Sequence, residues 1–294
     1  MTRRAATGVG FTAVLMWALL ALFTLGTAPV PPFLLTALCF GIGAALGVIW
    51  LGATGGFGGL RGVGWKVYAF GTAALFGYHA LYFSALRLAP AAEASLIAYL
   101  WPLFIVLFSG LLPGERLRAA HVAGAGLAFA GAALIVLRGG ADFDATAVPG
   151  LGLAFLCAII WAVYSVGARA MGAVPTAAVV VYCLATAVLS GVAHLAFEVT
   201  RWPVGSAGWV YVIALGLGPV GAAFFTWDIG MKKGDIQLLG VAAYAAPLLS
   251  TLALIAAGKA QATPALLLAA FLITGGAALA ARASLGGATP AKDG

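Results

Sequence analysis

The chain is a succession of long apolar segments separated by short stretches that carry charge, Gly or Pro. Each apolar segment runs for about twenty residues, a length that suits a helix crossing the hydrocarbon core of a bilayer. The strands of a membrane barrel would instead alternate between apolar and polar positions over about ten residues. The pattern therefore predicts an all-α membrane protein with ten transmembrane helices, at residues 8–26, 32–52, 66–88, 92–112, 119–138, 149–170, 176–198, 208–230, 236–257 and 264–283.

Composition leaves little room for a soluble domain. Hydrophobic residues make up 64% of the 294 positions and charged residues 8%, whereas soluble domains average about 45–50% apolar and about 25% charged residues. The first apolar segment follows Arg3 and Arg4 and imitates a signal peptide. It is longer than the usual hydrophobic region and has Trp17 at its middle, so we expect it to be retained as the first span.

The positive charges predict the orientation of the chain. Eleven of the 15 Lys and Arg residues fall on the side that holds the N-terminus, alternate loops and the C-terminus; only Arg87, Arg138, Arg201 and Lys259 fall on the other. Cytoplasmic loops carry the excess of positive charge, which places both termini in the cytoplasm. Because the cations are scattered between apolar segments, the net charge of +7 reflects topology, and we exclude nucleic acid as a partner.

Two stretches of the sequence repeat each other. Tyr99 and Pro102 recur as Tyr244 and Pro247, and the run Gly-Ala-Ala-Leu at residues 131–134 recurs at 276–279 in the same register. The shift is close to half the chain, which predicts two five-helix repeats at residues 1–145 and 146–294, joined through a linker at 139–149. An odd number of spans in each copy makes the copies inverted, as in carriers whose binding site lies between the halves.

Polar aromatic residues inside the predicted spans indicate a binding cavity. Tyr78 and Tyr82 are four apart and share a helix face, with His79 beside them. Trp and Tyr also collect at membrane interfaces, and ordinary packing is the alternative. Hydroxyl and indole groups deep in a membrane need partners in the protein or in a wet cavity, which favours a shared cavity. The substrate-binding candidates are Trp17, Tyr78, His79, Tyr82, Tyr99, Trp101, Trp161 and Tyr244.

The two halves are expected to contribute unequally to this cavity. Ala223, Phe224 and Ala246 stand where the first half has Tyr78, His79 and Trp101, so the polar aromatic lining is expected to lean on the first half. His79 is as compatible with a structural role as with a functional one. His79 and Asp228 are candidates for a proton-linked role, although carboxylates are too scarce in the spans to favour proton-driven export of cations.

Proline and glycine suggest where the helices bend or approach one another closely. Pro102 and Pro247 each lie about ten residues into a span, where a proline removes a helix hydrogen bond and gives either a simple kink or a hinge. Gly124, Gly131, Gly275 and Gly276 indicate close packing of the fifth and tenth spans, inside the protein or at a subunit contact.

The sequence contains none of the motifs that would indicate catalysis. It lacks HExxH, GxSxG and the phosphate-binding GxxxxGK[ST], so we expect no enzyme activity, no metal site and no cofactor. A small-molecule substrate and membrane lipids are the expected partners. The sequence makes no prediction of oligomeric state, substrate range, energy coupling or resting conformation.

One part of the sequence resembles a known family. Residues 85–103, ALRLAPAAEASLIAYLWPL, resemble the third-to-fourth span region of EamA-type drug/metabolite transporters, and Gly114-Glu115-Arg116 resembles their glutamate-bearing loop. Within the family, residues 99–102 are similar to the YddG-type aromatic amino acid exporters. The second half departs from the pattern, since residues 258–261 read Gly-Lys-Ala-Gln where a second glutamate loop is expected.

The resemblance implies a secondary transporter in a bacterial inner membrane that exports aromatic and other neutral amino acids by alternating access. The residues agree with this, because an aromatic substrate would stack on Tyr and Trp rings and its ammonium would lie on a ring face. One alternative is a multidrug or metabolite exporter of the same fold with a broad substrate range. An alternative of another class is a membrane scaffold that transports nothing.

Overall fold

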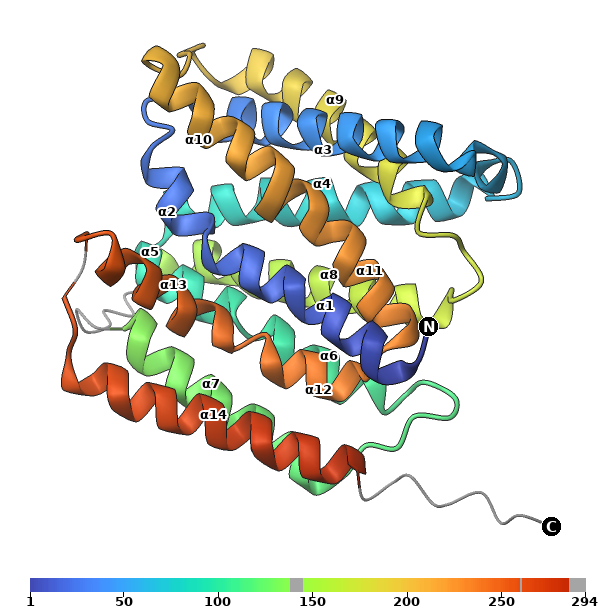
Figure 1. Cartoon of the computed structure of the whole chain (residues 1–294). Helices are drawn as coiled ribbons and strands as arrows, with labels where there is room; N and C mark the ends of the chain where they lie inside the picture. The colour runs from blue at the N-terminus through green and yellow to red at the C-terminus, as the bar shows by residue number, and fades with distance from the viewer. Residues whose placement is uncertain (138–144, 260, 286–294) are drawn as a thin grey trace.

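The computed structural model describes residues 1–137, 145–259 and 261–285, and these residues form helices and no strand. Figure 1 shows helices lying roughly along one direction, with the N-terminus and the end of α14 at the same end of the bundle. The elements are α1 (Arg3–Ala18), α2 (Leu20–Leu25), α3 (Pro32–Thr54), η1 (Gly56–Leu60), α4 (Trp65–Leu88), α5 (Ala91–Ala98), α6 (Trp101–Ser109), α7 (Ala119–Val136), η2 (Ala145–Ala147), α8 (Val148–Ala170), α9 (Ala178–Phe197), α10 (Gly205–Leu217), η3 (Gly218–Ala222), α11 (Ala223–Lys233), α12 (Ile236–Ala242), α13 (Ala245–Ala256) and α14 (Pro264–Leu285).

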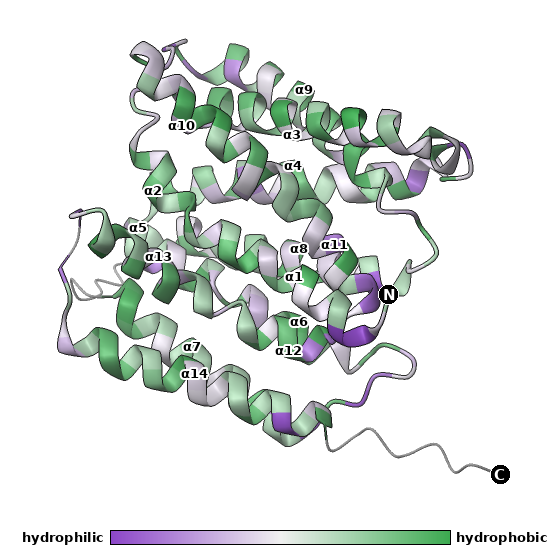
Figure 2. Cartoon of the chain, viewed as in Figure 1, coloured by the Kyte–Doolittle hydropathy of each residue, from purple (hydrophilic) through white to green (hydrophobic). Residues whose placement is uncertain are grey.

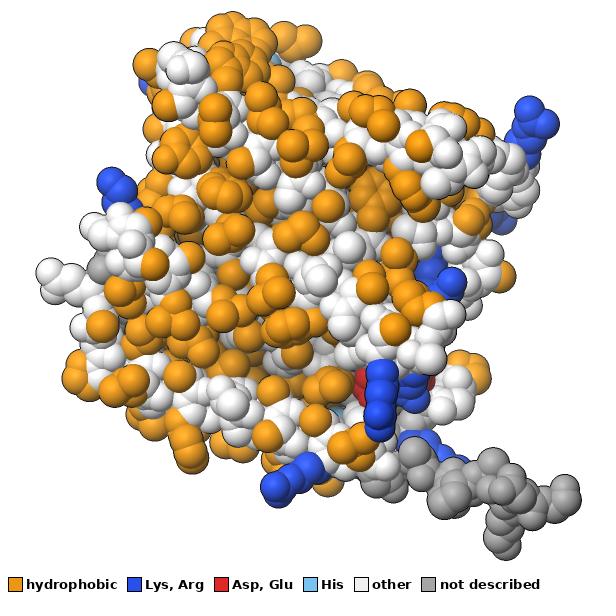
Figure 3. Space-filling view, viewed as in Figure 1, with side chains coloured by type: hydrophobic (Ala, Val, Ile, Leu, Met, Phe, Trp, Pro, Cys, Tyr) orange, Lys and Arg blue, Asp and Glu red, His pale blue; other side chains and the backbone are white. Residues whose placement is uncertain are grey.

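The helices have the length and composition of membrane-spanning segments. Among the described residues, nine helical segments are long and apolar enough to cross one. Hydrophobic residues run along most of each helix in Figure 2. Figure 3 shows one broad hydrophobic face, with Lys and Arg gathered towards its two ends. The all-α membrane class predicted from the sequence is confirmed.

The number of membrane crossings stays a prediction. The third predicted span corresponds to α4, which has 24 residues but is not among the nine apolar segments. Lys66, His79 and Arg87 lower its hydropathy. Some residues used in the sequence argument lie outside the described residues, namely Arg138, the linker residues 139–144, Ala260 and Lys292.

Several predicted spans are interrupted, where the sequence pattern indicated continuous segments. The fourth span breaks into α5 and α6 at residues 99–100, and the ninth breaks into α12 and α13 at residues 243–244. Pro102 is the second residue of α6 and Pro247 the third of α13. Proline suits the first turn of a helix, whose N–H groups need no helix carbonyl, so each break precedes its proline.

Two further breaks lie outside the repeated Tyr-x-x-Pro segments. Leu19 separates α1 from α2 in the first span. In the eighth span the π-helical turn η3, which contains Pro219, separates α10 from α11. A π-turn disturbs the regular hydrogen-bond ladder, and such turns often mark functional sites.

Helices from the two halves of the sequence pack in pairs. The pairs are α1 with α11, α3 with α9, α4 with α8, α6 with α12 and α7 with α14. The last pair approaches closely at Gly124, because a Cβ atom there would lie 2.6 Å from the carbonyl oxygen of Gly276. A Cβ on Gly131 would lie 2.9 Å from the carbonyl oxygen of Ala269. The predicted close packing is therefore internal at these positions, whereas a Cβ on Gly275 would meet no atom within 4 Å.

Candidate functional site

Four tryptophans from four different helices meet in the bundle. Trp17 of α1 lies 6.0 Å from Trp101 of α6, 5.9 Å from Trp161 of α8 and 5.0 Å from Trp227 of α11, measured between ring centroids. Trp101 also contacts Trp161 and Trp227, at 6.2 and 5.7 Å. These distances are typical of favourable aromatic pairs. We call these four residues the tryptophan cluster.

The indole N–H groups of this cluster differ in their partners. Trp17 donates to the carbonyl oxygen of Pro219 at 3.0 Å, within the π-turn η3. Trp227 donates to the hydroxyl of Ser165 at 3.1 Å. Trp101 and Trp161 donate to no acceptor in the part of the chain that the structure describes. The fold thus satisfies two of the four indole donors with described acceptors.

Two tyrosine rings of α4, Tyr78 and Tyr82, adjoin the cluster, and we call them the α4 wall. Tyr78 lies 5.4 Å from Trp161. Tyr82 stacks on Tyr78 at 6.1 Å with an interplanar angle of 15°, as their spacing of four predicts. The hydroxyl of Tyr82 shares a hydrogen bond of 2.9 Å with that of Ser95 on α5. The wall therefore presents stacked ring surfaces and hydroxyl groups next to Trp161.

His79 packs among aromatic side chains beside this wall. Its Nδ1 lies 2.7 Å from the carbonyl oxygen of Leu75, which can only accept. Nδ1 therefore carries a proton and donates to this oxygen. The ring lies 5.0 Å from Phe40 and 6.4 Å from Phe224. Both the structural and the functional role stay open for this residue.

Two predicted site residues do not join the tryptophan cluster. Tyr99 is partly buried at the break between α5 and α6, and it forms no ring contact with a described residue. Tyr244 is completely buried in a second apolar cluster, where its ring lies 5.9 Å from Phe129. The hydroxyl of Tyr244 accepts a hydrogen bond from the backbone N–H of Leu103 at 3.1 Å. Tyr244 thus holds the first turn of α6.

Sequence reasoning missed two rings that α11 contributes. Phe224 contacts Trp17 and Trp161 at 6.4 and 5.6 Å, and Trp227 is the fourth member of the tryptophan cluster. Trp227 stood close to the predicted end of its span, where tryptophan is expected at the membrane interface. Its spacing of three from Phe224 was the available signal, since such residues share a helix face. The cluster consequently draws on both halves of the chain.

Asp228 is buried, and one of its carboxylate oxygens has two hydrogen-bond partners. Its Oδ2 accepts hydrogen bonds from Lys232 Nζ at 2.8 Å and from the hydroxyl of Thr176 at 2.7 Å. A buried carboxylate is tolerated when it is paired and hydrogen-bonded in this way. The proton-linked role of Asp228 stays a prediction.

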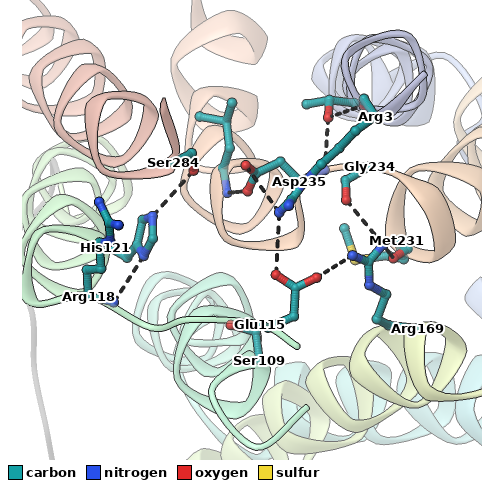
Figure 4. A network of polar contacts seen from close by, with 12 residues as sticks. Arg3, Ser109, Glu115, Arg118, His121, Arg169, Met231, Gly234, Asp235 and Ser284 are labelled. Atoms are coloured by element: carbon teal, nitrogen blue, oxygen red, sulfur yellow. Dashed lines mark hydrogen bonds and ion pairs between the residues drawn. The ribbon is translucent and has the colours of Figure 1, made fainter. Parts of the chain in front are cut away.

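Figure 4 shows a polar network at the end of the bundle that holds the N-terminus. The carboxylate of Glu115 bridges Arg3, at 3.4 Å, and Arg169. Arg3 also lies 3.4 Å from Asp235 at the start of α12. We call Arg3, Glu115, Arg169 and Asp235 the N-terminal-end network.

Arg169 adds backbone contacts to this network. It donates to the carbonyl oxygens of Lys232 at 2.7 Å and Gly234 at 3.2 Å, at the end of α11. A cation there matches the negative end of the helix dipole. The glutamate that the family resemblance singled out, Glu115, therefore connects both halves of the chain.

Glu198 has a comparable place at the opposite end of the bundle. It accepts hydrogen bonds from the backbone N–H groups of Phe33 at 2.9 Å and Leu34 at 3.2 Å, where α3 begins. It also contacts His194 at 2.9 Å and Arg87 at 3.7 Å. A carboxylate suits a helix N-terminus, whose first N–H groups lack partners.

Comparisons with known proteins agree on one family. The EamA-like transporter family model matches residues 6–137 and again residues 148–282. A curated protein of Ancylobacter novellus named aromatic amino acid exporter YddG is 56% identical over 289 residues, which cover 95% of this chain and 98% of that protein. A solved crystal structure with 55% sequence identity matches with a TM-score of 0.94 over 98% of this chain and 100% of that chain. The chain therefore belongs to the EamA-like transporter family.

Proposed function

We propose that this protein exports aromatic and related neutral amino acids across a bacterial inner membrane, and that the substrate binds against the tryptophan cluster and the α4 wall. The observation that carries the proposal is the meeting of Trp17, Trp101, Trp161 and Trp227 inside a membrane bundle. The name of the Ancylobacter novellus relative supports the same substrate class.

The chemistry of the cluster suits an amino acid zwitterion. A substrate ring would pack edge-to-face against the indoles, and its ammonium would lie over a ring face. The free indole N–H groups of Trp101 and Trp161 would donate to the substrate carboxylate. The one buried acid of α11, Asp228, is compensated by Lys232. A net-neutral substrate needs no buried charge of opposite sign, whereas a phosphorylated metabolite would.

The proposal includes ten membrane spans in two inverted repeats, at residues 1–145 and 146–294, with both termini in the cytoplasm. Support comes from the helix pairs, because α1 with α11 and α4 with α8 are reciprocal pairs of first and third spans. The pairs α3 with α9, α6 with α12 and α7 with α14 join equivalent spans. A two-fold relation between the halves produces this pattern.

Topology is tested by a reporter fused to the C-terminus. We expect a signal from a cytoplasmic reporter and none from one that is active only in the periplasm. An internal fusion after Leu60, in the loop before α4, serves as a same-side control. A periplasmic signal at the C-terminus would contradict the inverted arrangement.

Alternating access requires each end of the bundle to open in turn. The N-terminal-end network joins Arg3 and Glu115 of the first half to Arg169 and Asp235 of the second. Opening that end would separate these pairs, and the helix breaks before Pro102 and Pro247 would absorb the movement. Both prolines remain hinge candidates within this proposal.

Counterflow in proteoliposomes tests the function. Purified protein is reconstituted with unlabelled Phe or Trp inside, and entry of labelled substrate is followed. We expect transient accumulation, which falls strongly in Tyr78→Ala and Tyr82→Ala at equal amounts of folded protein. Failure to exchange any amino acid, with drugs still transported, would favour the multidrug exporter. Repeating the assay with and without a pH gradient separates facilitated diffusion from proton exchange.

A further inference from the structure

A crevice opens at the N-terminal end of the bundle, away from the tryptophan cluster. Residues of α1, α7, α12 and α14 line it, together with the loop before α7, and its volume is about 640 Å³. Part of this region is drawn in Figure 4. None of the residues proposed to bind the transported substrate lines it.

The charges that line this crevice are unbalanced. Four arginines face two carboxylates, since its charged lining residues are Arg3, Arg4, Arg116, Arg118, Glu115 and Asp235. Both carboxylates are already engaged, Glu115 by Arg3 and Arg169, and Asp235 by Arg3 and by the backbone N–H of Leu238. Among the described residues that line the crevice, positive charge therefore exceeds negative charge.

Arg4 and Arg116 account for this excess. Both are exposed, and neither forms an ion pair with a described residue. A guanidinium presents several donors in a fixed plane, which fits the oxygens of a phosphate group two at a time. The two side chains are thus free to bind an anion that enters the crevice.

A buried amide supplies a second, independent indication of a ligand. Gln237 of α12 lines the crevice and is only 2% exposed. Its Nε2 has no hydrogen-bond acceptor within the described residues. Buried polar groups are nearly always hydrogen-bonded, and an unpaired one is costly. An oxygen-rich group in the crevice would provide the missing acceptor.

Part of the remaining wall of the crevice is apolar, although Thr7, His121 and Ser284 also line it. Leu238 of α12 and Ala281 and Leu285 of α14 line it, and Leu285 is 62% exposed. A ligand that matches this surface has a negatively charged head and a hydrocarbon portion. Basic pockets between membrane helices, at the depth of the lipid head groups, bind phospholipids with this character.

We propose that the crevice binds the phosphate group of an anionic phospholipid. Arg4 and Arg116 contact the phosphate oxygens, and the amide of Gln237 donates to an oxygen of the head group. The acyl chains leave along Leu238 and Leu285. The lipid thereby occupies a site between α1 and α14, next to the N-terminal-end network but distinct from the substrate site.

Native mass spectrometry of the purified full-length protein tests the site. Phosphatidylglycerol and phosphatidylcholine are titrated separately, and bound lipid is counted. We expect phosphatidylglycerol to be retained in preference to phosphatidylcholine. The double variant Arg4→Gln/Arg116→Gln should bind phosphatidylglycerol about thirtyfold more weakly, the loss expected for two arginines near a head group. The matched control Arg61→Gln/Arg201→Gln removes two arginines elsewhere and should bind like the wild type.

A second variant tests the same site in case the double variant fails to fold. Gln237→Leu keeps the charge and approximate size of the side chain but removes the amide, and we expect severalfold weaker binding with an unchanged elution profile on gel filtration. Equal binding of both lipids, or unchanged binding in the double variant and in Gln237→Leu, would overturn the proposal.

Soluble competitors separate lipid from free phosphate. Inorganic phosphate and glycerol 3-phosphate share the phosphate chemistry but lack acyl chains. We expect neither to displace phosphatidylglycerol at millimolar concentration. Displacement by either would identify a site for soluble phosphate esters and overturn the assignment to a lipid.

Discussion

The two Tyr-x-x-Pro segments, residues 99–102 and 244–247, share a sequence pattern and a helix break but have different surroundings. Tyr99 is partly buried, whereas Tyr244 is completely buried. Trp101 in the first segment belongs to the tryptophan cluster, and the second segment has Ala246 at that position. The repeated backbone feature has therefore been kept while the side chains have taken on different tasks.

The second segment supports the first directly. Tyr244 accepts the N–H of Leu103, one of the first N–H groups of α6 that no carbonyl of the same helix can reach. This hydrogen bond joins the two breaks across the halves of the chain. The comparison teaches that one segment forms the candidate site and the other fixes the helix that carries it.

Removing the ring of Trp101 should have the largest effect on transport, because this ring belongs to the first segment alone. Trp101 contacts three other indoles, so its removal both deletes a ring of the proposed site and unpacks its neighbours. One aromatic contact to the substrate is worth about 0.5–1.5 kcal/mol, and we therefore expect Trp101→Ala to lower counterflow of labelled Trp by about tenfold or more. The control Trp202→Ala changes a residue that is 55% exposed and should leave exchange unchanged. Full exchange in Trp101→Ala would remove the first segment from the site.

The hydroxyl groups of Tyr244 and Tyr99 should differ in how much they contribute to the stability of the protein. Tyr244→Phe leaves the Leu103 N–H without its acceptor, which costs about 1–3 kcal/mol. We expect the midpoint of thermal unfolding in detergent to fall by a few degrees, about what such a loss produces in a protein of this size. Tyr99→Phe should leave the midpoint unchanged. Equal shifts in the two variants would mean that Tyr244 has no special supporting role.

The limits of the helices could be predicted because charge, Gly and Pro separate the apolar segments. The prediction of 32–52 compares with α3 at Pro32–Thr54, and that of 149–170 with α8 at Val148–Ala170. Bends near Pro102 and Pro247 were expected from the prolines, whereas the breaks at Leu19 and at η3 were not predicted. They are stabilised by groups distant in sequence, such as the Trp17 N–H on Pro219 in η3.

The candidate site was predictable where a polar ring lay inside a span. Trp17, Trp101 and Trp161 stood out because an indole in hydrocarbon needs a partner. Phe224 did not stand out, because it carries no polar group and its spacing of three from Trp227 was its one signal. Phe197, also an apolar ring in a span, is 73% exposed. Tyr244 was included on the strength of the repeat, and only its packing shows that it belongs to another cluster.

Replacing either proline with alanine should have the smallest effect on transport. An alanine at position 102 or 247 adds a backbone N–H that can bond to the carbonyl four residues earlier, and it removes the ring that clashes with that carbonyl in a continuous helix. The two short helices at each break are then free to join into one stiffer helix. We expect severalfold slower exchange with little change in half-saturation concentration, measured as counterflow rates over a range of substrate concentrations.

Pro102→Ala should slow exchange more than Pro247→Ala, because residue 101 carries the indole of the site and residue 246 carries a methyl group. Normal turnover in both variants would rule out the breaks as hinges, and an equal loss would mean that they move as a pair despite their different surroundings.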